Sequence, residues 1–314
     1  MKIFQNQSLK NELHSAAINS VWFSHQDAFL ERSKPDEPHH VAAFIIRGMN
    51  VLAKHWSESL SKRGIELNLT SVFCHGFPRV SFEQNGKQSS VELADLLVVR
   101  RHFNRGKLEK ETACLIQSKM SDDSTNRVSR DDPQFYLFKN WPQFSFKQKD
   151  YDTRQRSIGN VHGQSLYSLI LKQQAYPEQI FGWPDTCCWS IVEDLKLNME
   201  SDASFARFLE KLVAFETGRE FYSDPKVGCE WSQLIQQLLE VTFNKKLTAG
   251  PYKAPKRGNG FDSINFLSSS LPITPSSDEI DNLPPNVDEQ EFEENNPQRG
   301  ANTIIIETNQ LERY

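Results

Sequence analysis

The sequence is poor in cysteine and contains no long apolar run. Its five cysteines are an odd number, only Cys187 and Cys188 are adjacent, and no CxxC spacing occurs, so neither a disulfide framework nor a tetrahedral zinc site is indicated. No segment approaches the roughly 18 consecutive apolar residues of a membrane span. The first residues, MKIFQNQSLKNELH, include no apolar core of a secretory signal. We therefore expect a protein of the reducing cytoplasm without a membrane partner.

Familiar catalytic signatures are missing as well. The sequence contains no phosphate-binding loop, no dinucleotide fingerprint and no identifiable Ser/His/Asp or Cys/His set. It also contains no internal repeat. These absences argue against nucleotide-dependent enzymes, triad hydrolases and repeat scaffolds.

The acidic charge of the chain is concentrated in one segment. The net charge at pH 7 is −5, but Asp278–Glu294 contains eight acidic residues and no basic one. Without these eight charges, the remainder of the chain carries +3. A mildly basic folded part is compatible with nucleic acid as a partner. The acidic segment is expected to be a solubilising tail or, in a sharper alternative, to cover the basic site or recruit a regulatory protein partner.

Hydrophobic periodicity divides the chain before residue 145 into helices followed by strands. Apolar residues recur at steps of three and four over 41–63, which indicates a helix that Gly64 can end. Alternating segments then predict a meander of strands, with Asn85-Gly86 as a hairpin turn. The expected elements are helices over 9–22 and 41–63 and strands over 65–74, 79–82, 91–101 and 112–120.

Beyond residue 145, the clearest patterns are helical, over 205–215 and 231–243. From 248 to 300, Gly, Pro, Ser, Asn and acidic residues predominate, which predicts disorder. The sequence therefore predicts five parts: an N-terminal segment (1–40), an α/β core (41–145), a helical extension packed on the core (146–247), a disordered acidic tail (248–300) and a short strand within 301–314.

Three polar residues interrupt the apolar strand segments. Asp95 stands among four apolar neighbours, and a buried carboxylate costs several kcal/mol unless it is paired. Gln117 and Lys119 are two residues apart, so they share one face of the strand expected beside Asp95. A carboxylate and a second oxygen donor can hold Mg²⁺, while a lysine can orient water or stabilise developing charge. The alternative is structural, with Asp95 a hydrogen-bonded core residue and Gln117 and Lys119 marking a strand end.

The predicted helix precedes a meander, with an Asp in one apolar strand and a Gln-x-Lys on the next. This arrangement resembles the PD-(D/E)xK nuclease superfamily and is closest to its Mrr-like branch. The resemblance covers residues 41–145 and implies a restriction-endonuclease-like mixed sheet flanked by helices. It implies that Asp95, Gln117 and the main-chain carbonyl of Ser118 ligate Mg²⁺ or Mn²⁺, and that Lys119 assists the nucleophile. The family also often places a glutamate on the preceding helix near the site, for which Glu58 is the first candidate and Glu66 the second.

Basic residues cluster around the turn between the two strands that carry this motif. Arg100, Arg101, Arg105 and Lys107 could grip a phosphate backbone, or could simply form a solvated hairpin tip. The loop over 139–156 interleaves aromatic and basic residues, which suits single-stranded nucleic acid. We expect its aromatic residues, however, to anchor the loop to the core.

The combined expectation is a metal-dependent endonuclease that hydrolyses phosphodiester bonds, with DNA as the expected substrate. By analogy with the superfamily, it would act in restriction or anti-phage defence. Double-strand cutting would make a homodimer plausible. A second possibility is a catalytically inactive nucleic-acid- or protein-binding module on the same fold, and a third is an unrelated α/β scaffold protein.

Overall fold

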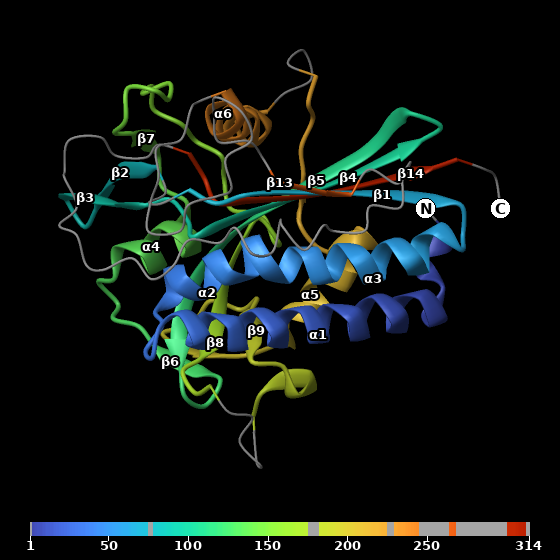
Figure 1. The fold of residues 1–314 in the computed structure, drawn as a ribbon. Coiled ribbons are helices and arrows are strands. Elements are labelled where there is room, and N and C mark those ends of the chain that lie inside the picture. Colours follow the sequence, from blue (N-terminus) through green and yellow to red (C-terminus); the bar gives the residue numbers. More distant parts are fainter. Residues whose placement is uncertain are drawn as a thin grey trace.

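The computed structural model describes residues 2–74, 78–174, 182–224, 229–244, 264–267 and 300–311, which form a mixed α/β fold (Figure 1). The helices are η1 (Lys2–Gln5), α1 (Gln7–Glu31), α2 (Glu37–Ala43), the π-helical η2 (Phe44–Gly48), α3 (Met49–Ser61), α4 (Pro133–Asn140), η3 (Pro184–Thr186), α5 (Phe205–Val213) and α6 (Glu230–Asn244).

The strands of the described chain are β1 (Ile65–Val72), β2 (Arg79–Gln84), β3 (Lys87–Glu92), β4 (Leu96–Asn104), β5 (Lys107–Ser121), β6 (Thr125–Arg127), β7 (Phe144–Phe146), β8 (Ser165–Leu171), β9 (Trp189–Val192), β10 (Asn198–Glu200), β11 (Ala203–Ser204), β12 (Arg219–Glu220), β13 (Ile264–Leu267) and β14 (Thr303–Gln310). The main sheet has nine strands in the order β11-β9-β8-β5-β4-β14-β1-β13, and β12 pairs with β5. Two small sheets, β3-β2-β7 and β10-β6, accompany it.

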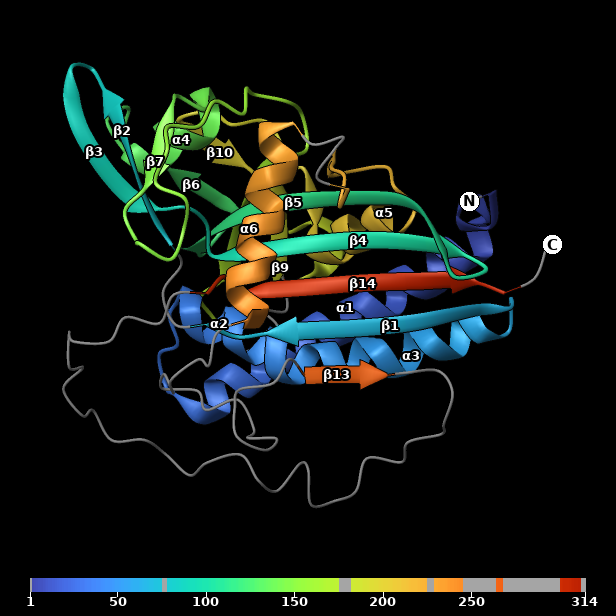
Figure 2. The ribbon, with the colours of Figure 1, turned by 90° about the horizontal axis from the view of Figure 1, so that it is seen from above.

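The main sheet is mixed, and its helices lie on both faces. β4 pairs antiparallel with β5, whereas β5 with β8 and β14 with β4 pair in parallel. Helices α1, α3 and α5 lie on one face of the long strands, and α6 lies on the other (Figures 1 and 2). None of the helices that the structure describes is both long enough and apolar enough to cross a membrane.

The helices before the sheet begin at capping residues that the sequence supplies. The Asn6 side chain accepts a hydrogen bond from the Leu9 amide at the start of α1, and Asp36 accepts one from the His39 amide at the start of α2. The single helix expected over 41–63 is instead a continuous run of α2, η2 and α3 that begins at Glu37. At Gly48, a Cβ would lie 2.6 Å from the Phe44 ring, so only glycine permits this close packing.

The strands expected as one meander are divided between two sheets. The Asn85-Gly86 turn joins β2 to β3 with positive φ angles of 51° and 72°, as predicted, but this hairpin pairs with β7. β1 is separated from β4 by β14, the strand expected within 301–314. Residues 304–306 of β14 are buried, because the strand is central in the sheet and helices cover both of its faces (Figure 1).

The segment over 146–247 contains more than the helices that its pattern predicted. It includes α5 and α6, but its strands β8, β9, β11 and β12 belong to the main sheet. The segment over 146–247 is therefore not only a helical extension packed on the core, because it also extends the main sheet. The acidic run Asp278–Glu294, and with it the role expected for the tail, lies outside the described residues.

Candidate active site

Asp95 lies directly before β4, and its backbone is fixed from two sides. Its amide donates to the Ile116 carbonyl at 2.9 Å, which aligns it with β5. Its carbonyl accepts a hydrogen bond of 2.8 Å from the side chain of Asn302, the residue before β14. The Asn302 side chain also accepts from the Cys74 amide at 2.7 Å. Asn302 therefore ties Asp95 to the end of β1.

The Asp95 carboxylate faces β5, as the strand pairing predicted. Its Oδ2 accepts a 2.6 Å hydrogen bond from the Ser118 amide and a second, short one from the Gln117 side-chain amide. Burial raises the pKa of Asp95 to about 7, against the Ser118 amide and the Lys119 ammonium, which lower it. Asp95 nevertheless keeps some solvent exposure. The structure thus holds a carboxyl whose charge is poorly compensated, in a residue that is only partly buried.

The side chain of Gln134, on the first turn of α4, links Gln117 to Lys119. It donates to Gln117 Oε1 at 2.9 Å and accepts from Lys119 Nζ at 3.3 Å. Lys119, Gln134, Gln117 and Asp95 therefore form one hydrogen-bonded chain. Sequence reasoning missed Gln134, because its role depends on how α4 docks against β5.

A glutamate from the preceding helix does lie beside Asp95, but it is Glu37. Glu37 begins α2, and its Oε1 accepts a 3.2 Å hydrogen bond from the Met120 amide, one residue beyond Lys119. Its charge, with that of Glu92, further raises the pKa of Asp95. The sequence held a signal for it, since Asp36 and Pro38 mark a helix start that places Glu37 in the first turn.

The two glutamates chosen from the sequence lie elsewhere. Glu58 is exposed on α3, near the end that leads into the start of β1. Glu66 accepts a 3.0 Å hydrogen bond from Asn309, which is in register with Phe103 on β4. Phe103 is eight residues from Asp95, roughly 26 Å along an extended strand. The structure does not bring Glu58 or Glu66 to Asp95.

Tyr167 is a second residue that the sequence did not single out. It lies on β8 in register with Gln117, so both side chains leave the same face of the sheet. Its ring is buried, and its hydroxyl has no hydrogen-bond partner among the described residues. Burial, and then the charges of Asp132 and Asp95, raise the pKa of this phenol.

Arg100, expected at a phosphate grip, is instead a core residue. It is fully buried, donates to Thr308 Oγ1 at 2.7 Å and lies between the rings of Phe4 and Phe215, at 5.3 and 4.6 Å from their centroids. Burial lowers its pKa to about 9. The expectation fails for Arg100 because both faces of β4 are covered at this point, as the burial of Val98 and Val99 shows.

The other three basic residues lie along the hairpin away from Asp95. Arg101 forms ion pairs with Glu111 at 3.0 Å and Glu307 at 3.4 Å. Arg105 and Lys107 are exposed at the hairpin tip. The tip lies roughly 30 Å from Asp95, at the other end of β4 (Figure 2). Contact between these residues and a phosphate at Asp95 would require a ligand that runs the length of the strand.

The aromatic residues of the 139–156 loop anchor it, as expected. Trp141, Phe144, Phe146 and Tyr151 are all buried. Of the basic residues beside them, Arg156 is also buried, and it pairs with carboxylates of the fold. This loop therefore does not offer its aromatic rings as a stacking surface.

The Asp95 cluster offers oxygen donors and none of the Cys or His ligands of a zinc site. No group of three or more His, Cys, Asp or Glu side chains in the described part of the chain is placed to hold a metal. Mg²⁺, however, commonly takes one or two carboxylates and keeps several waters. Asp95 and Glu37 are such oxygen donors. A bound divalent cation would lower the raised pKa of Asp95, because it would stabilise the charged carboxylate. Gln117 fits as a further donor once its oxygen leaves Gln134.

Comparisons with known proteins give this site no relative. No protein-family model matches the chain, and searches of curated proteins and of solved structures found no match. The case for function therefore depends on the residues and their geometry.

Proposed function

We propose that this protein is a metal-dependent nuclease that hydrolyses phosphodiester bonds at Asp95, Gln117 and Lys119. The observation that carries the proposal is the hydrogen-bonded chain from Asp95 through Gln117 and Gln134 to Lys119. It brings together a carboxyl and an ammonium of two partly exposed residues, Asp95 and Lys119, and the amide oxygen of the buried Gln117. A mixed sheet with helices on both faces supports a restriction-endonuclease-like core.

Each residue has a role that its surroundings support. Asp95 and Glu37 would hold Mg²⁺ or Mn²⁺, with Gln117 and the Ser118 carbonyl as further oxygen donors. The bound ion would polarise a phosphoryl oxygen and lower the pKa of a bound water. The Lys119 ammonium would orient the attacking water or stabilise charge on the phosphate. Gln134 holds that ammonium toward Gln117 in the ligand-free site.

The proposed substrate is DNA, and a role in restriction or anti-phage defence follows from the superfamily resemblance alone. One observation favours the second candidate, a catalytically inactive binding module on the same fold. Gln117 is neutral, and its oxygen already accepts from Gln134, which weakens the set of metal ligands.

A cleavage assay separates these two functions. Plasmid, linear duplex, single-stranded DNA and RNA are incubated with the protein, with Mg²⁺, Mn²⁺ or EDTA. We expect metal-dependent cleavage that Asp95→Ala and Lys119→Ala abolish, while Glu58→Gln, on exposed α3, cleaves normally. Binding without cleavage would support the inactive module. Cleavage that survives both substitutions in folded protein would reject the site.

A further inference from the structure

The hydrogen-bonded chain at the site runs in one direction, from the Lys119 ammonium to the Asp95 carboxylate. Lys119 Nζ donates to Gln134 Oε1 at 3.3 Å, and Gln134 Nε2 donates to Gln117 Oε1 at 2.9 Å. Gln117 Nε2 in turn donates to Asp95 Oδ2. An ammonium can only donate, and an ionised carboxylate can only accept. The two ends of the chain therefore fix the way in which both glutamine amides face.

Gln117 cannot keep this orientation and also ligate a cation. Its side-chain oxygen faces Gln134, and its nitrogen faces Asp95. To direct its oxygen at an ion beside the Asp95 carboxylate, the Gln117 amide must turn over, which brings its nitrogen to Gln134. That nitrogen would then meet the Gln134 nitrogen, and two donors cannot bond to each other. The Gln134 amide must therefore turn over as well.

The turn of the Gln134 amide changes what Lys119 contacts. Once the Gln134 oxygen accepts from Gln117, the Gln134 nitrogen faces the Lys119 ammonium in place of the oxygen. Both groups are donors, so the bond between Lys119 and Gln134 is lost. Gln134 is the hydrogen-bond partner that the ammonium has among the described residues. Its loss leaves the ammonium available to a water or to a phosphate oxygen.

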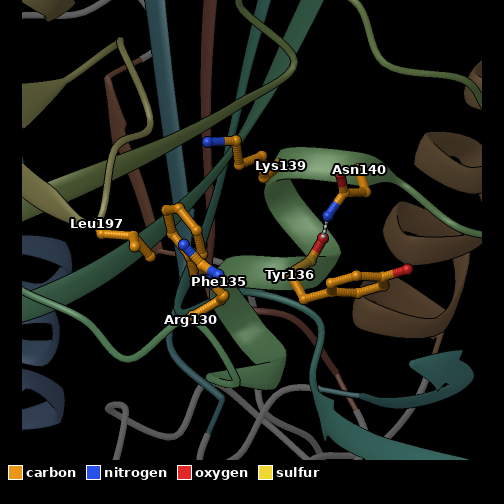
Figure 3. Close-up of a pocket in the computed structure, with 6 residues that line it drawn as sticks. All are labelled: Arg130, Phe135, Tyr136, Lys139, Asn140 and Leu197. Atoms are coloured by element: carbon orange, nitrogen blue, oxygen red, sulfur yellow. Dashed lines mark hydrogen bonds between the residues drawn. The ribbon is translucent and has the colours of Figure 1, made fainter. Parts of the chain in front are cut away.

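The backbone that carries Gln134 is held, so only side chains have to move. Asp132 caps α4 by accepting from the Phe135 amide at 2.8 Å, and the Asn140 side chain donates to the Tyr136 carbonyl at 3.0 Å (Figure 3). An amide that turns over exchanges an oxygen for a nitrogen of nearly the same size, which asks little of its neighbours. A pocket of about 280 Å³ opens beside α4 without Gln134 in its lining, which consists of Arg130, Phe135, Tyr136, Lys139, Asn140 and Leu197.

We propose that Gln117 and Gln134 form a relay that couples metal binding at Asp95 to the release of Lys119. Gln134 is then a positioning residue, which holds the lysine ammonium back from the reacting phosphate until Gln117 ligates the ion. The inference rests on the proposed nuclease function and deepens it, because it adds an order of events. The ion is bound first, and the lysine becomes available second.

Chemical labelling of the lysine amine follows this release without any cleavage. The full chain is treated with a limiting amount of acetic anhydride at pH 8, in Mg²⁺ or in EDTA, and acetylation of Lys119 is measured by mass spectrometry relative to the exposed Lys54. We expect Mg²⁺ to raise the labelling rate of Lys119 about fivefold in the wild type, the factor that corresponds to the loss of one hydrogen bond. Calorimetry on the same samples measures whether Mg²⁺ binds.

Two variants of Gln134 separate the relay from the direct effect of the Mg²⁺ charge on the ammonium. Gln134→Leu offers Lys119 no acceptor, so labelling should be fast already in EDTA, with little further effect of Mg²⁺. Gln134→Glu can accept from Lys119 and Gln117 at once, because both carboxylate oxygens are acceptors, so labelling should stay slow in Mg²⁺ as well. Gln88→Leu, a substitution of an exposed glutamine on β3, is the matched control and should respond like the wild type.

Two results would overturn the relay alone. One is Mg²⁺ binding by the wild type without faster labelling of Lys119, and the other is a Mg²⁺ response in Gln134→Leu as large as that of the wild type. If Gln134→Leu does not fold, Gln134→Glu decides the outcome, and fast labelling of Lys119 in Mg²⁺ would count against the relay. A wild type that neither binds Mg²⁺ nor cleaves nucleic acid would reject the nuclease function together with the relay.

Discussion

Replacing Asp95 with asparagine should stabilise the metal-free protein at neutral pH. An aspartate in the unfolded chain releases its proton near pH 3.8, whereas Asp95 in the fold holds it up to about pH 7. The raised pKa means that Asp95 lowers the stability of the fold progressively as pH rises from about 4 to 7. Above pH 7 the loss is complete and constant.

The magnitude follows from the two pKa values. Each pKa unit corresponds to 1.36 kcal/mol, so the shift amounts to about 4 kcal/mol at pH 8. An asparagine oxygen can still accept the bonds from Gln117 and Ser118, but its amide group needs a new acceptor. That unmet donor costs about 1–2 kcal/mol. We therefore expect Asp95→Asn to raise the free energy of unfolding at pH 8 by about 2–3 kcal/mol.

Urea unfolding in EDTA at pH 4, 6 and 8 measures this difference. Asp95→Asn should be about 1–2 kcal/mol less stable than the wild type at pH 4, because only the unmet amide donor counts there. Its relative stability should then rise up to pH 7 and stay level above it. Glu58→Gln, on the exposed side of α3, should stay within about 0.5 kcal/mol of the wild type throughout. If Asp95→Asn were less stable than the wild type at both pH 4 and pH 8, the carboxylate would be a structural acceptor. The reasoning about the site would then be refuted.

Three further predictions concern residues around this site and the helices beside it. Glu37→Gln should weaken Mn²⁺ binding about tenfold, because it removes a carboxylate beside Asp95. Calorimetry measures this affinity, and an unchanged value would place Glu37 outside the proposed metal site. Tyr167→Phe should leave the free energy of unfolding unchanged or raise it by up to about 1 kcal/mol, since its buried hydroxyl has no partner among the described residues. Ser168→Ala should lower it by about 1 kcal/mol, because Ser168 donates to Ser118 at 2.9 Å. A loss in Tyr167→Phe as large as that in Ser168→Ala would contradict this. His40 is buried, and neither of its ring nitrogens has a hydrogen-bond partner in the part of the chain that the structure describes. Burial lowers its pKa to about 3, so the free energy of unfolding should fall by about 2 kcal/mol from pH 7 to pH 5 on its account. His40→Phe should flatten this part of the urea-unfolding profile, and an equally steep profile would show that other groups take up the protons.

The sequence predicted those parts of the site that depend on neighbouring strands. Asp95, Gln117 and Lys119 meet because β4 and β5 form a hairpin, and hairpin pairing follows from local spacing and turn residues. The Arg105-Gly106 turn, with φ angles of 53° and 76°, lies between the two strand segments, where a turn was expected. Local pattern was sufficient in this part of the fold.

Residues that depend on docking between distant elements were not predictable in this way. Gln134 reaches the site because α4 packs against β5, and Glu37 because α2 does. Asn302 contacts Asp95 across 207 residues of sequence. Periodicity shows which face of an element is apolar, but not which element that face will meet. Arg100 stands where the apolar run Leu96–Val99 meets the basic turn, and the structure buries it with the apolar run, so neither a phosphate grip nor a solvated tip applies to it.

The position of β14 has a consequence for the order in which the protein can be made. A ribosome synthesises Asp95 first and Asn302 207 residues later, roughly 10–40 s at ordinary rates of elongation. Until residues 300–311 emerge, β1 and β4 lack the strand that lies between them, and the Asp95 carbonyl lacks its Asn302 donor. A nascent chain therefore holds an unfinished sheet. The backbone of Asp95 is therefore fixed from both sides only after β14 has been made.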